Sequence, residues 1–196
     1  YNFYSSNKFT PEANVPILQF EEKKTYPGGA FLLASLLNDE NFNVDFYTNV
    51  GKENYKSLNS EINVIDAELD LNTTIKKRII LDRDYLHRID RDVIVEMNED
   101  ARNSLLYKFQ SKIEQYSAVV VADYNKGILD QKLISEIKMI SNKRNLPIFL
   151  DPKPENDIGL DGWTFIKPNL QEAIKITGSS GINEIVDFFN KKLKSG

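Results

Sequence analysis

Hydrophobic residues in the second half of the chain follow two alternating patterns. In three segments the apolar residues recur every three to four positions, which is the spacing of one buried helix face; these segments are residues 105–116, 133–140 and 182–193. Three short runs are apolar throughout, which is typical of strands buried on both faces; these runs are Val119–Ala122, Ile148–Leu150 and Thr164–Ile166. Because strand and helix alternate, the pattern predicts an α/β domain built on a mainly parallel sheet.

The first half of the chain carries a different pattern, in which β-branched residues alternate with charged ones. Residues 15–20 and 73–96 show this alternation. Strands of this kind have one face in water, so they predict a small antiparallel sheet that projects from the main body. Between them, Gly29–Leu37 is predicted to form a buried helix and Val44–Thr48 a core strand. No internal repeat or Pro/Gly-rich linker divides the chain, which favours one domain over residues 1–196.

Polar residues follow each of the three apolar runs directly. Asp123–Gly127 comes after the first run, Asp151–Lys153 after the second and Lys167–Asn169 after the third. In open α/β sheets, ligands bind beyond the carboxyl ends of the strands. Repeated Asp and Lys at these positions therefore predict a site for an anionic ligand, and a phosphate-handling enzyme is the leading interpretation.

Composition narrows the chemistry that this site can use. The formal net charge of −4 argues against a dedicated nucleic-acid binder, although 25 Lys and Arg residues leave enough cations for a local basic pocket. The absence of cysteine excludes disulfides and Cys-ligated zinc, and His87 as the only histidine cannot build a His-rich metal site or a Ser-His-Asp triad. Catalysis is left to carboxylates, lysines or bound Mg²⁺.

The ends and the hydropathy of the chain suggest its location and extent. No apolar run approaches the roughly 20 residues that span a bilayer, and no basic-then-apolar leader opens the sequence, so we expect a cytoplasmic protein without a membrane partner. The chain begins without Met and ends just after a helical pattern. We therefore expect it to be a piece of a longer reading frame.

Seven short motifs occur in a fixed order and cover nearly the whole chain. They are Thr10–Ile17, Pro27–Ala30, Thr73–Arg78, Leu86–Asp90, Asp123–Gly127, Asp151–Lys153 and Pro168–Glu172. In this order they resemble the kinase domain of the D-glycero-β-D-manno-heptose 7-phosphate kinases, a branch of the ribokinase-like (PfkB) carbohydrate kinase family.

This resemblance implies a fold and an activity. The fold would be a three-layer α/β/α sandwich with a mainly parallel sheet and a small β-sheet lid, the lid strands lying at about residues 9–20 and 73–96 of a single, partial domain. The activity would be ATP-dependent, Mg²⁺-assisted phosphorylation of a sugar phosphate, most closely heptose 7-phosphate to the 1,7-bisphosphate, for ADP-heptose and lipopolysaccharide precursor synthesis. Relatives of this type often form homodimers and some carry a fused nucleotidyltransferase domain, so both stay open for this protein.

The resemblance also assigns residues to the sugar phosphate. Gly28 and Gly29 would let the backbone approach the sugar, whereas the simpler alternative is a tight turn that enters a helix. Lys76, Arg78 and Arg88 would hold the phosphate of the sugar from the lid, since Arg suits bidentate phosphate contacts. Their alternative is a solvated strand face with ordinary ion pairs to nearby aspartates.

A second group of residues is expected at the carboxyl ends of the strands. Asp123 and Lys126 would lie near the sugar and the transferred phosphate, although Asp123 could instead cap backbone amides. Lys153 would contact the ATP phosphates; its alternative is an ordinary exposed lysine in a proline-flanked loop. Asn169 and Glu172 would serve the nucleotide–metal site, with Glu172 acting on Mg²⁺ through water, but their spacing also predicts a helix capping box, and both roles can hold at once.

Two departures from the family pattern affect the interpretation. Relatives usually carry Ala-Asn-Val-Ala after Gly-Gly-Ala, whereas this chain has Phe31–Ala34 with Leu32 in place of the amide, which raises another PfkB-type sugar kinase as an alternative. The Gly-Ala-Gly-Asp string that supplies the catalytic base does not occur, so no catalytic residue is predicted within this chain. We expect a fragment that is inactive by itself; the alternative is a non-catalytic sugar-phosphate-binding relative.

Overall fold

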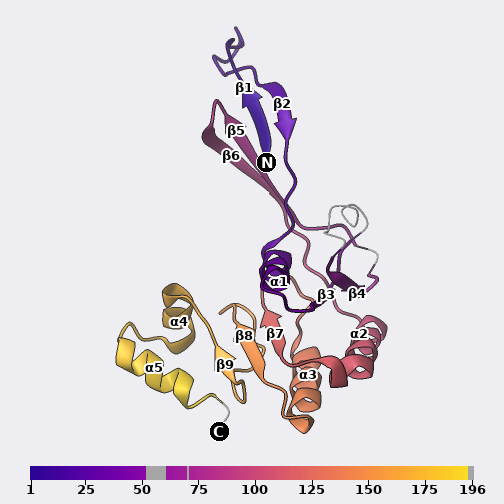
Figure 1. Cartoon of the computed structure of the whole chain (residues 1–196). Coiled ribbons are helices and arrows are strands. Elements are labelled where there is room, and N and C mark those ends of the chain that lie inside the picture. The colour runs from indigo at the N-terminus through magenta and orange to yellow at the C-terminus, as the bar shows by residue number, and fades with distance from the viewer. Residues whose placement is uncertain (52–60, 70, 194–196) are drawn as a thin grey trace. The chain divides into compact units, whose positions relative to one another are not determined.

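The computed structural model describes residues 1–51, 61–69 and 71–193. Backbone contacts divide the chain into two compact units (Figure 1). Unit 1 comprises the described residues of 1–43, 50–62 and 70–93, and unit 2 those of 44–49, 63–69 and 94–196. In the described part of the chain, no helix has the length and apolar character needed to cross a membrane.

Unit 1 contains a four-stranded sheet with the order β2-β1-β5-β6. Its strands are β1 (Asn2–Ser5), β2 (Gln19–Lys23), β5 (Ile75–Leu81) and β6 (Asp84–Arg91). Asp82 and Arg83 both have positive φ, as the two-residue turn of a tight hairpin requires, and they join β5 to β6. Every residue of β6 is exposed, so both faces of this strand are in water, whereas the sequence predicted only one wet face.

Two details of this sheet differ from the sequence prediction. The strand expected at residues 15–20 begins only at Gln19, and β1 was not predicted at all. β1 pairs antiparallel with β2 but parallel with β5, so the sheet is mixed rather than antiparallel. The alternation of apolar and charged residues reports which face of a strand is wet, but it carries no information on strand direction.

Helix α1 (Gly29–Asp39) also belongs to unit 1. Phe31 and Ala34 are buried, whereas Leu32 and Leu36 are 56% and 54% exposed. The prediction of a buried helix was therefore correct for one face only.

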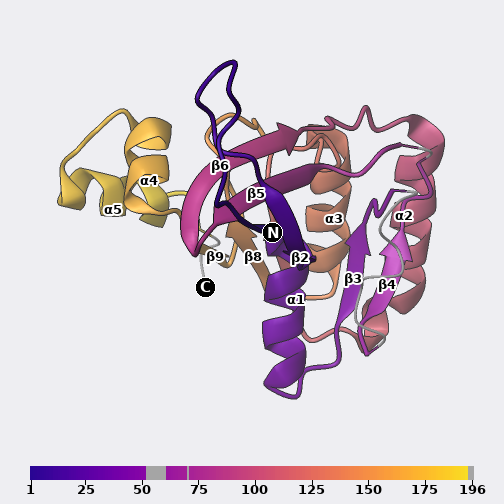
Figure 2. The ribbon, with the colours of Figure 1, turned by 90° about the horizontal axis from the view of Figure 1, so that it is seen from above.

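Unit 2 contains two parallel sheets and the remaining helices. One sheet pairs β3 (Asp45–Thr48) with β4 (Asn63–Asp66), and the other has the order β7-β8-β9. The elements of the second sheet and the helices are β7 (Val119–Ala122), β8 (Ile148–Asp151), β9 (Phe165–Ile166), α2 (Glu99–Lys112) with the short 3₁₀ turn η2 (Ile113–Gln115), α3 (Gln131–Lys143), α4 (Leu170–Thr177) and α5 (Ile182–Asn190). Figure 2 shows β3 and β4 side by side with α2 next to them. The predicted α/β class with mainly parallel pairing is confirmed in this unit.

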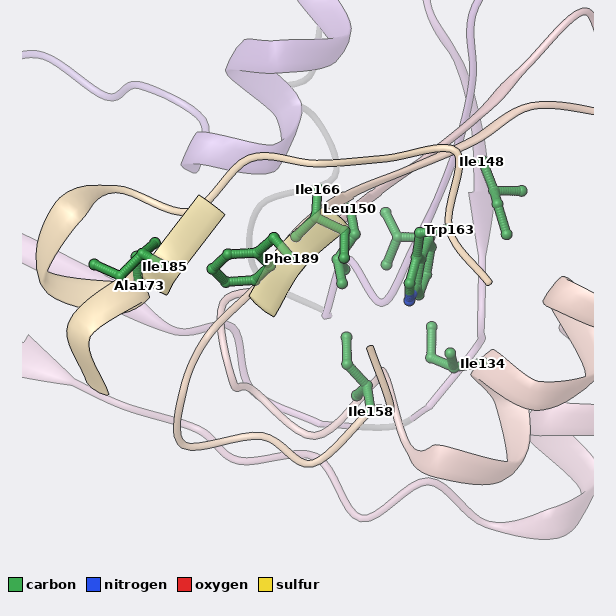
Figure 3. Packing of buried hydrophobic residues seen from close by; sticks show 10 residues of the cluster. Ile134, Ile148, Leu150, Ile158, Trp163, Ile166, Ala173, Ile185 and Phe189 are labelled. Atoms are coloured by element: carbon green, nitrogen blue, oxygen red, sulfur yellow. The ribbon is translucent and has the colours of Figure 1, made fainter. Parts of the chain in front are cut away.

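A hydrophobic cluster that includes Trp163 joins β7, β8 and β9 to α3, α4 and α5 (Figure 3). Trp163 is fully buried, and its indole N–H donates to the Gly159 carbonyl oxygen at 2.9 Å. The other members come from β7, β8, β9, α3, α4, α5 and the 158 loop; they are Val121, Ile134, Ile148, Leu150, Ile158, Ile166, Ala173, Ile185 and Phe189. These are mostly the positions that the apolar runs and helical periodicity select, because each is the inward residue of its element.

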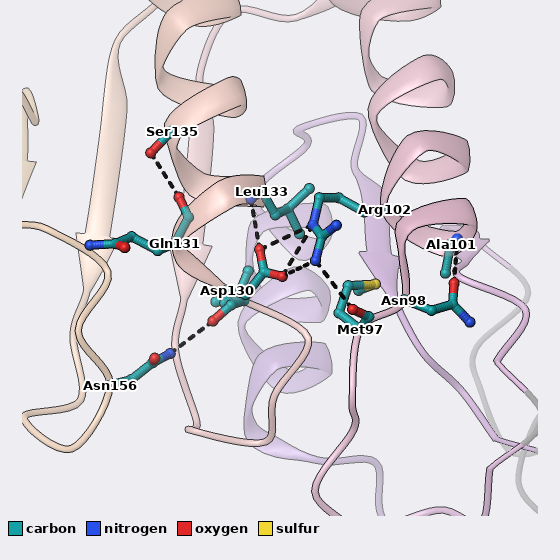
Figure 4. A network of polar contacts seen from close by, with 10 residues as sticks. Met97, Asn98, Ala101, Arg102, Asp130, Gln131, Leu133, Ser135 and Asn156 are labelled. Carbon is teal, nitrogen blue, oxygen red and sulfur yellow. Dashed lines mark hydrogen bonds and ion pairs between the residues drawn. The ribbon is translucent and has the colours of Figure 1, made fainter.

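Polar contacts join the beginning of α2 to the beginning of α3 (Figure 4). Asp130 is the N-cap of α3, and its carboxylate accepts a hydrogen bond from the Leu133 N–H at 2.7 Å. The same carboxylate forms an ion pair with Arg102, which also donates to the Met97 carbonyl oxygen at 3.2 Å. Since Asp130 ends the loop that follows β7, these contacts fix one end of that loop.

Candidate functional site

The carboxyl ends of β7, β8 and β9 lie along one edge of their sheet. The strands are parallel neighbours, with Ala122 opposite Asp151 and Leu150 opposite Ile166. The polar segments that follow the three strands therefore start from the same edge, as the sequence predicted. The predicted residues Asp123, Lys126, Lys153 and Asn169 belong to these segments, and Glu172 lies in the first turn of α4, directly after the third segment.

The loop after β7 is held in a defined conformation. The Asp123 N–H donates to the Asp151 carbonyl oxygen at 3.0 Å, and the Val95 N–H donates to the Lys126 carbonyl oxygen at 2.8 Å. Gly127 has φ +84°, and a Cβ at this position would lie 1.9 Å from the Val95 carbonyl oxygen. Only glycine fits so close to another backbone segment in this conformation.

Asp123 is 2% exposed, and only one of its carboxylate oxygens has a hydrogen-bond partner among the described residues. Oδ1 accepts a hydrogen bond from the Asn125 N–H at 2.7 Å, so the predicted alternative, in which Asp123 caps a backbone amide, describes this oxygen. Oδ2 is buried and has no hydrogen-bond partner among the described residues. Capping therefore accounts for half of the carboxylate.

Lys153 and Glu172 form an ion pair between Nζ and Oε1. The other oxygen of Glu172, Oε2, accepts a hydrogen bond from the Asn169 N–H at 2.8 Å, and Asn169 Oδ1 accepts one from the Glu172 N–H at 2.9 Å. These reciprocal bonds are the predicted capping box at the start of α4. Both carboxylate oxygens of Glu172 are thus engaged by the protein itself.

The ion pair shifts the pKa values of both partners. Burial alone would raise the pKa of Glu172, but the hydrogen bonds from Lys153 and the Asn169 N–H outweigh it, so the pKa of Glu172 lies below its ordinary value. The hydrogen bond to Glu172 raises the pKa of Lys153. At neutral pH both groups are therefore charged.

These residues suit a metal–nucleotide better than a metal ion held by protein alone. Among the described residues, no three His, Asp or Glu side chains cluster closely enough to hold a metal. Mg²⁺ commonly keeps several waters and takes one or two carboxylates together with substrate phosphates. One carboxylate that acts through water, next to one lysine for the phosphates, fits that arrangement.

A second ion pair at this edge was not assigned from the sequence. Lys167 Nζ lies 3.0 Å from Asp151 Oδ1, and Lys167 also contributes to the lowered pKa of Glu172. Asp151 is the last residue of β8 and Lys167 directly follows β9, and each precedes a proline. The sequence placed both residues in the polar segments but assigned ligand roles only to Lys153 and Asn169.

The glycine candidates of unit 1 lie at the beginning of α1. Gly28 is the N-cap, with extended φ and ψ of −69° and 172°, and Gly29 is the first helical residue. A Cβ at Gly28 would meet no atom within 4 Å. Neither backbone strain nor crowding within the described chain thus requires glycine at position 28.

The cationic candidates of unit 1 lie on neighbouring strands. Arg78 on β5 is directly opposite Arg88 on β6, and Lys76 is opposite Asp90. Arg88 forms an ion pair with Asp90 at 2.8 Å, which is one of the pairs that the solvated-face alternative predicted. The Arg78 guanidinium lies over the Tyr1 ring, 5.1 Å from its centroid. The sheet therefore brings Arg78 and Arg88 together, while Asp90 partly neutralises Arg88.

Known proteins with related sequences were found, although no family model matches the chain. The bifunctional protein HldE of Aliarcobacter butzleri is 27% identical over 97% of the chain, and that of Haemophilus influenzae strain PittEE is 30% identical over 99%. The chain covers 43% and 41% of these two proteins, so it spans about two-fifths of the relatives' length.

Solved structures show the same fold at low sequence identity. Phosphofructokinase-2 from Escherichia coli superposes with a TM-score of 0.68 at 14% identity, covering 98% of this chain and 66% of that one. The chain has the ribokinase-like fold of the PfkB-type sugar kinases. A carbohydrate kinase from Agrobacterium tumefaciens superposes with a TM-score of 0.63 at 15% identity, and the match covers 100% of this chain and 66% of the Agrobacterium chain. The expected fold class is confirmed, and the sequence relates this ribokinase-fold domain to the HldE proteins.

Proposed function

We propose that this ribokinase-fold domain serves the ATP-dependent phosphorylation of a sugar phosphate, D-glycero-β-D-manno-heptose 7-phosphate, to the 1,7-bisphosphate. The observation that carries the proposal is the sequence relationship to HldE proteins over 97% of the chain. The Lys153–Glu172 ion pair and the capped α4 at one sheet edge support it, because phosphoryl transfer depends mainly on positioned charges.

The proposed roles divide between the two units. In unit 2, Lys153 would bind the nucleotide phosphates, Asn169 and Glu172 would orient the waters of a bound Mg²⁺, and Asp123 and Lys126 would face the sugar. In unit 1, Lys76, Arg78 and Arg88 would hold the phosphate that the sugar already carries, and the backbone of Gly28 and Gly29 would lie against its ring. Mg²⁺ bound with ATP would neutralise charge on the transferred phosphoryl group.

The proposal also covers the domain composition, the assembly and the cellular location of the full-length protein. The bifunctional names of the relatives support a second activity in the full-length protein, which we propose is that of a fused nucleotidyltransferase domain, and we propose a homodimer as its assembly. ATP and sugar phosphates are cytoplasmic metabolites, so we place the protein there, with its product entering ADP-heptose and lipopolysaccharide precursor synthesis.

The test measures sugar-dependent ADP release by the full-length protein. Heptose 7-phosphate, fructose 6-phosphate and fructose 1-phosphate are compared with a control that lacks sugar. We expect the highest kcat/KM with heptose 7-phosphate. A hexose phosphate that reacts faster favours a different PfkB-type kinase, and sugar binding without ADP release favours a non-catalytic relative.

Leu32 is the observation that favours a different sugar as substrate. It is 56% exposed in the first turn of α1, where the resembling kinases carry an amide that can bind a hydroxyl. If heptose 7-phosphate is the substrate, Leu32→Asn should raise its kcat/KM about tenfold, since one hydrogen bond gained is worth roughly that factor. Leu36→Asn is the matched control, because Leu36 lies one turn further along α1 and is 54% exposed. Equal kcat/KM values for Leu32→Asn, Leu36→Asn and wild type would contradict a sugar contact at position 32.

A further inference from the structure

Four charged side chains of alternating sign gather at the ends of β8 and β9. Lys153 pairs with Glu172, and Lys167 pairs with Asp151 at 3.0 Å. Each pair also acts on the other. After the hydrogen bond to Glu172, the negative charge of Asp151 helps to raise the pKa of Lys153. Although burial raises the pKa of Glu172, the positive charge of Lys167 helps Lys153 to lower it. The proposed function gives no role to Lys167 or Asp151.

The two carboxylates of this cluster differ in how well water can replace a lysine. The Glu172 side chain is 10% exposed, whereas the Asp151 side chain is 34% exposed. A buried carboxylate that loses its cation keeps an uncompensated charge, which is strongly destabilising, whereas an exposed ion pair contributes little. Opening the Lys153–Glu172 pair therefore costs more free energy than opening the Lys167–Asp151 pair.

Backbone hydrogen bonds hold Lys167 and the Glu172 carboxylate beside the same short segment. The Lys167 N–H donates to the Leu150 carbonyl oxygen at 2.8 Å, which fixes the Lys167 backbone at the end of the sheet. Glu172 Oε2 accepts the N–H of Asn169, which lies two residues after Lys167. The Lys167 side chain is 65% exposed, and its ammonium is carried on a flexible four-carbon stem. Lys167 can therefore change its partner without repacking the core.

Nucleotide binding provides a reason for such a change. In the proposed function, a nucleotide phosphate draws Lys153 away from Glu172 and leaves that carboxylate without its cation. We propose that Lys167 then exchanges Asp151 for Glu172. Lys167 is thus a positioning residue for Lys153, because its charge lowers the free-energy cost of opening the Lys153–Glu172 pair. It strengthens nucleotide binding without touching the nucleotide. This inference rests on the proposed role of Lys153 in binding nucleotide phosphates.

The experiment measures the Kd of Mg²⁺-free ATP by calorimetric titration of the full-length protein in two backgrounds. In the wild-type background, Lys167→Met should weaken ATP binding about fivefold, because residues of one ion-pair network couple by roughly this factor or more. In the Glu172→Gln background no carboxylate is left to neutralise, so Lys167→Met should change the Kd by less than about twofold. Lys167→Arg keeps the cation and should restore the wild-type Kd.

Lys175→Met is the matched control for the loss of one positive charge. The Lys175 side chain is 63% exposed, and it pairs with Glu155 at 3.2 Å rather than with a member of the four-residue cluster. This variant should leave the Kd of ATP within about twofold of its parent in both backgrounds. The thermal midpoints of Lys167→Met and Lys175→Met should stay close to that of wild type, since exposed ion pairs contribute little to stability.

Each other outcome overturns the inference. Equal weakening by Lys167→Met in both backgrounds would mean that Lys167 binds the phosphates directly. An unchanged Kd in Lys167→Met, while wild type binds ATP and releases ADP with sugar, removes the role of Lys167 and leaves the kinase proposal intact. A lowered midpoint without rescue by Lys167→Arg assigns Lys167 to the fold. A wild-type protein that binds no ATP overturns the proposed function, and this inference with it.

Discussion

At the scale of single residues, the central finding is that both carboxylate oxygens of Glu172 have partners within the protein. One oxygen binds Lys153 and the other binds the Asn169 N–H. If Lys153 and Glu172 serve the nucleotide and its metal, the ion pair must open when they bind, so each residue keeps the other neutralised until then.

The substitution Glu172→Gln separates the capping role of Glu172 from its ion pair with Lys153. Glutamine can still complete a capping box but cannot pair with Lys153 as an anion. We expect Mg²⁺-free ATP to bind more tightly to this variant, since Lys153 is released, and the gain in ATP affinity on adding Mg²⁺ to shrink. Calorimetric titration of ATP with and without Mg²⁺ measures both effects. The control is Glu155→Gln, which opens the exposed Lys175–Glu155 pair and should change neither Kd.

The Lys153–Glu172 ion pair predicts that the stability of the protein depends on pH. Because the pKa of Glu172 is lowered in the folded protein, its contribution is present above the ordinary glutamate pKa of about 4.3 and is lost as pH falls through the folded value. The difference in thermal midpoint between wild type and Glu172→Gln should therefore be largest near neutral pH and diminish below about pH 4. A difference that does not change with pH would show that the ion pair contributes nothing to stability.

At the scale of elements, the loop between β7 and α3 depends on the packing of Gly127 against Val95. Gly127→Ala places a Cβ against the Val95 backbone and forces alanine into the positive φ that Gly127 adopts. We therefore expect a loss of about 3 kcal/mol or more in the free energy of unfolding. Gly178→Ala, at the end of α4, has the same sign of φ but no atom within 4 Å of the new Cβ, and should cost about 1 kcal/mol. Urea denaturation of both variants measures the difference, and equal losses would contradict the close packing.

At the scale of the whole molecule, the stability of unit 2 depends on the cluster around Trp163. Trp163→Ala should lower the free energy of unfolding by about 3–5 kcal/mol, because it leaves a large cavity among strands and helices. Tyr107→Ala changes an aromatic side chain that is 75% exposed on α2, and should stay within about 0.5 kcal/mol of wild type. Circular dichroism during urea unfolding follows both variants, and a small effect at Trp163 would show that the cluster can collapse around the gap.

Much of unit 2 could be predicted from sequence, and less of unit 1. The inward residues of α3 and of β7 to β9 follow from apolar spacing, and Asn169 and Glu172 follow from the capping-box pattern, since all depend on neighbours a few residues apart. β1 could not be predicted, because four residues without alternation become a strand only through their pairing with β2 and β5. The exposed face of α1 was missed because a uniformly apolar helix gives no sign of which side is covered.

The sequence by itself determined the element types of unit 2 apart from β4, the order of the kinase-like motifs and the sheet edge at which polar residues gather. These depend on local periodicity and on the rule that parallel strands end together. Only the tertiary structure decided that Lys153 pairs with Glu172, that Lys167 pairs with Asp151, and that one oxygen of Asp123 is buried with no donor in the described part of the chain. The partners in those pairs are 19 and 16 residues apart in sequence, and side chains so distant meet only when the chain packs.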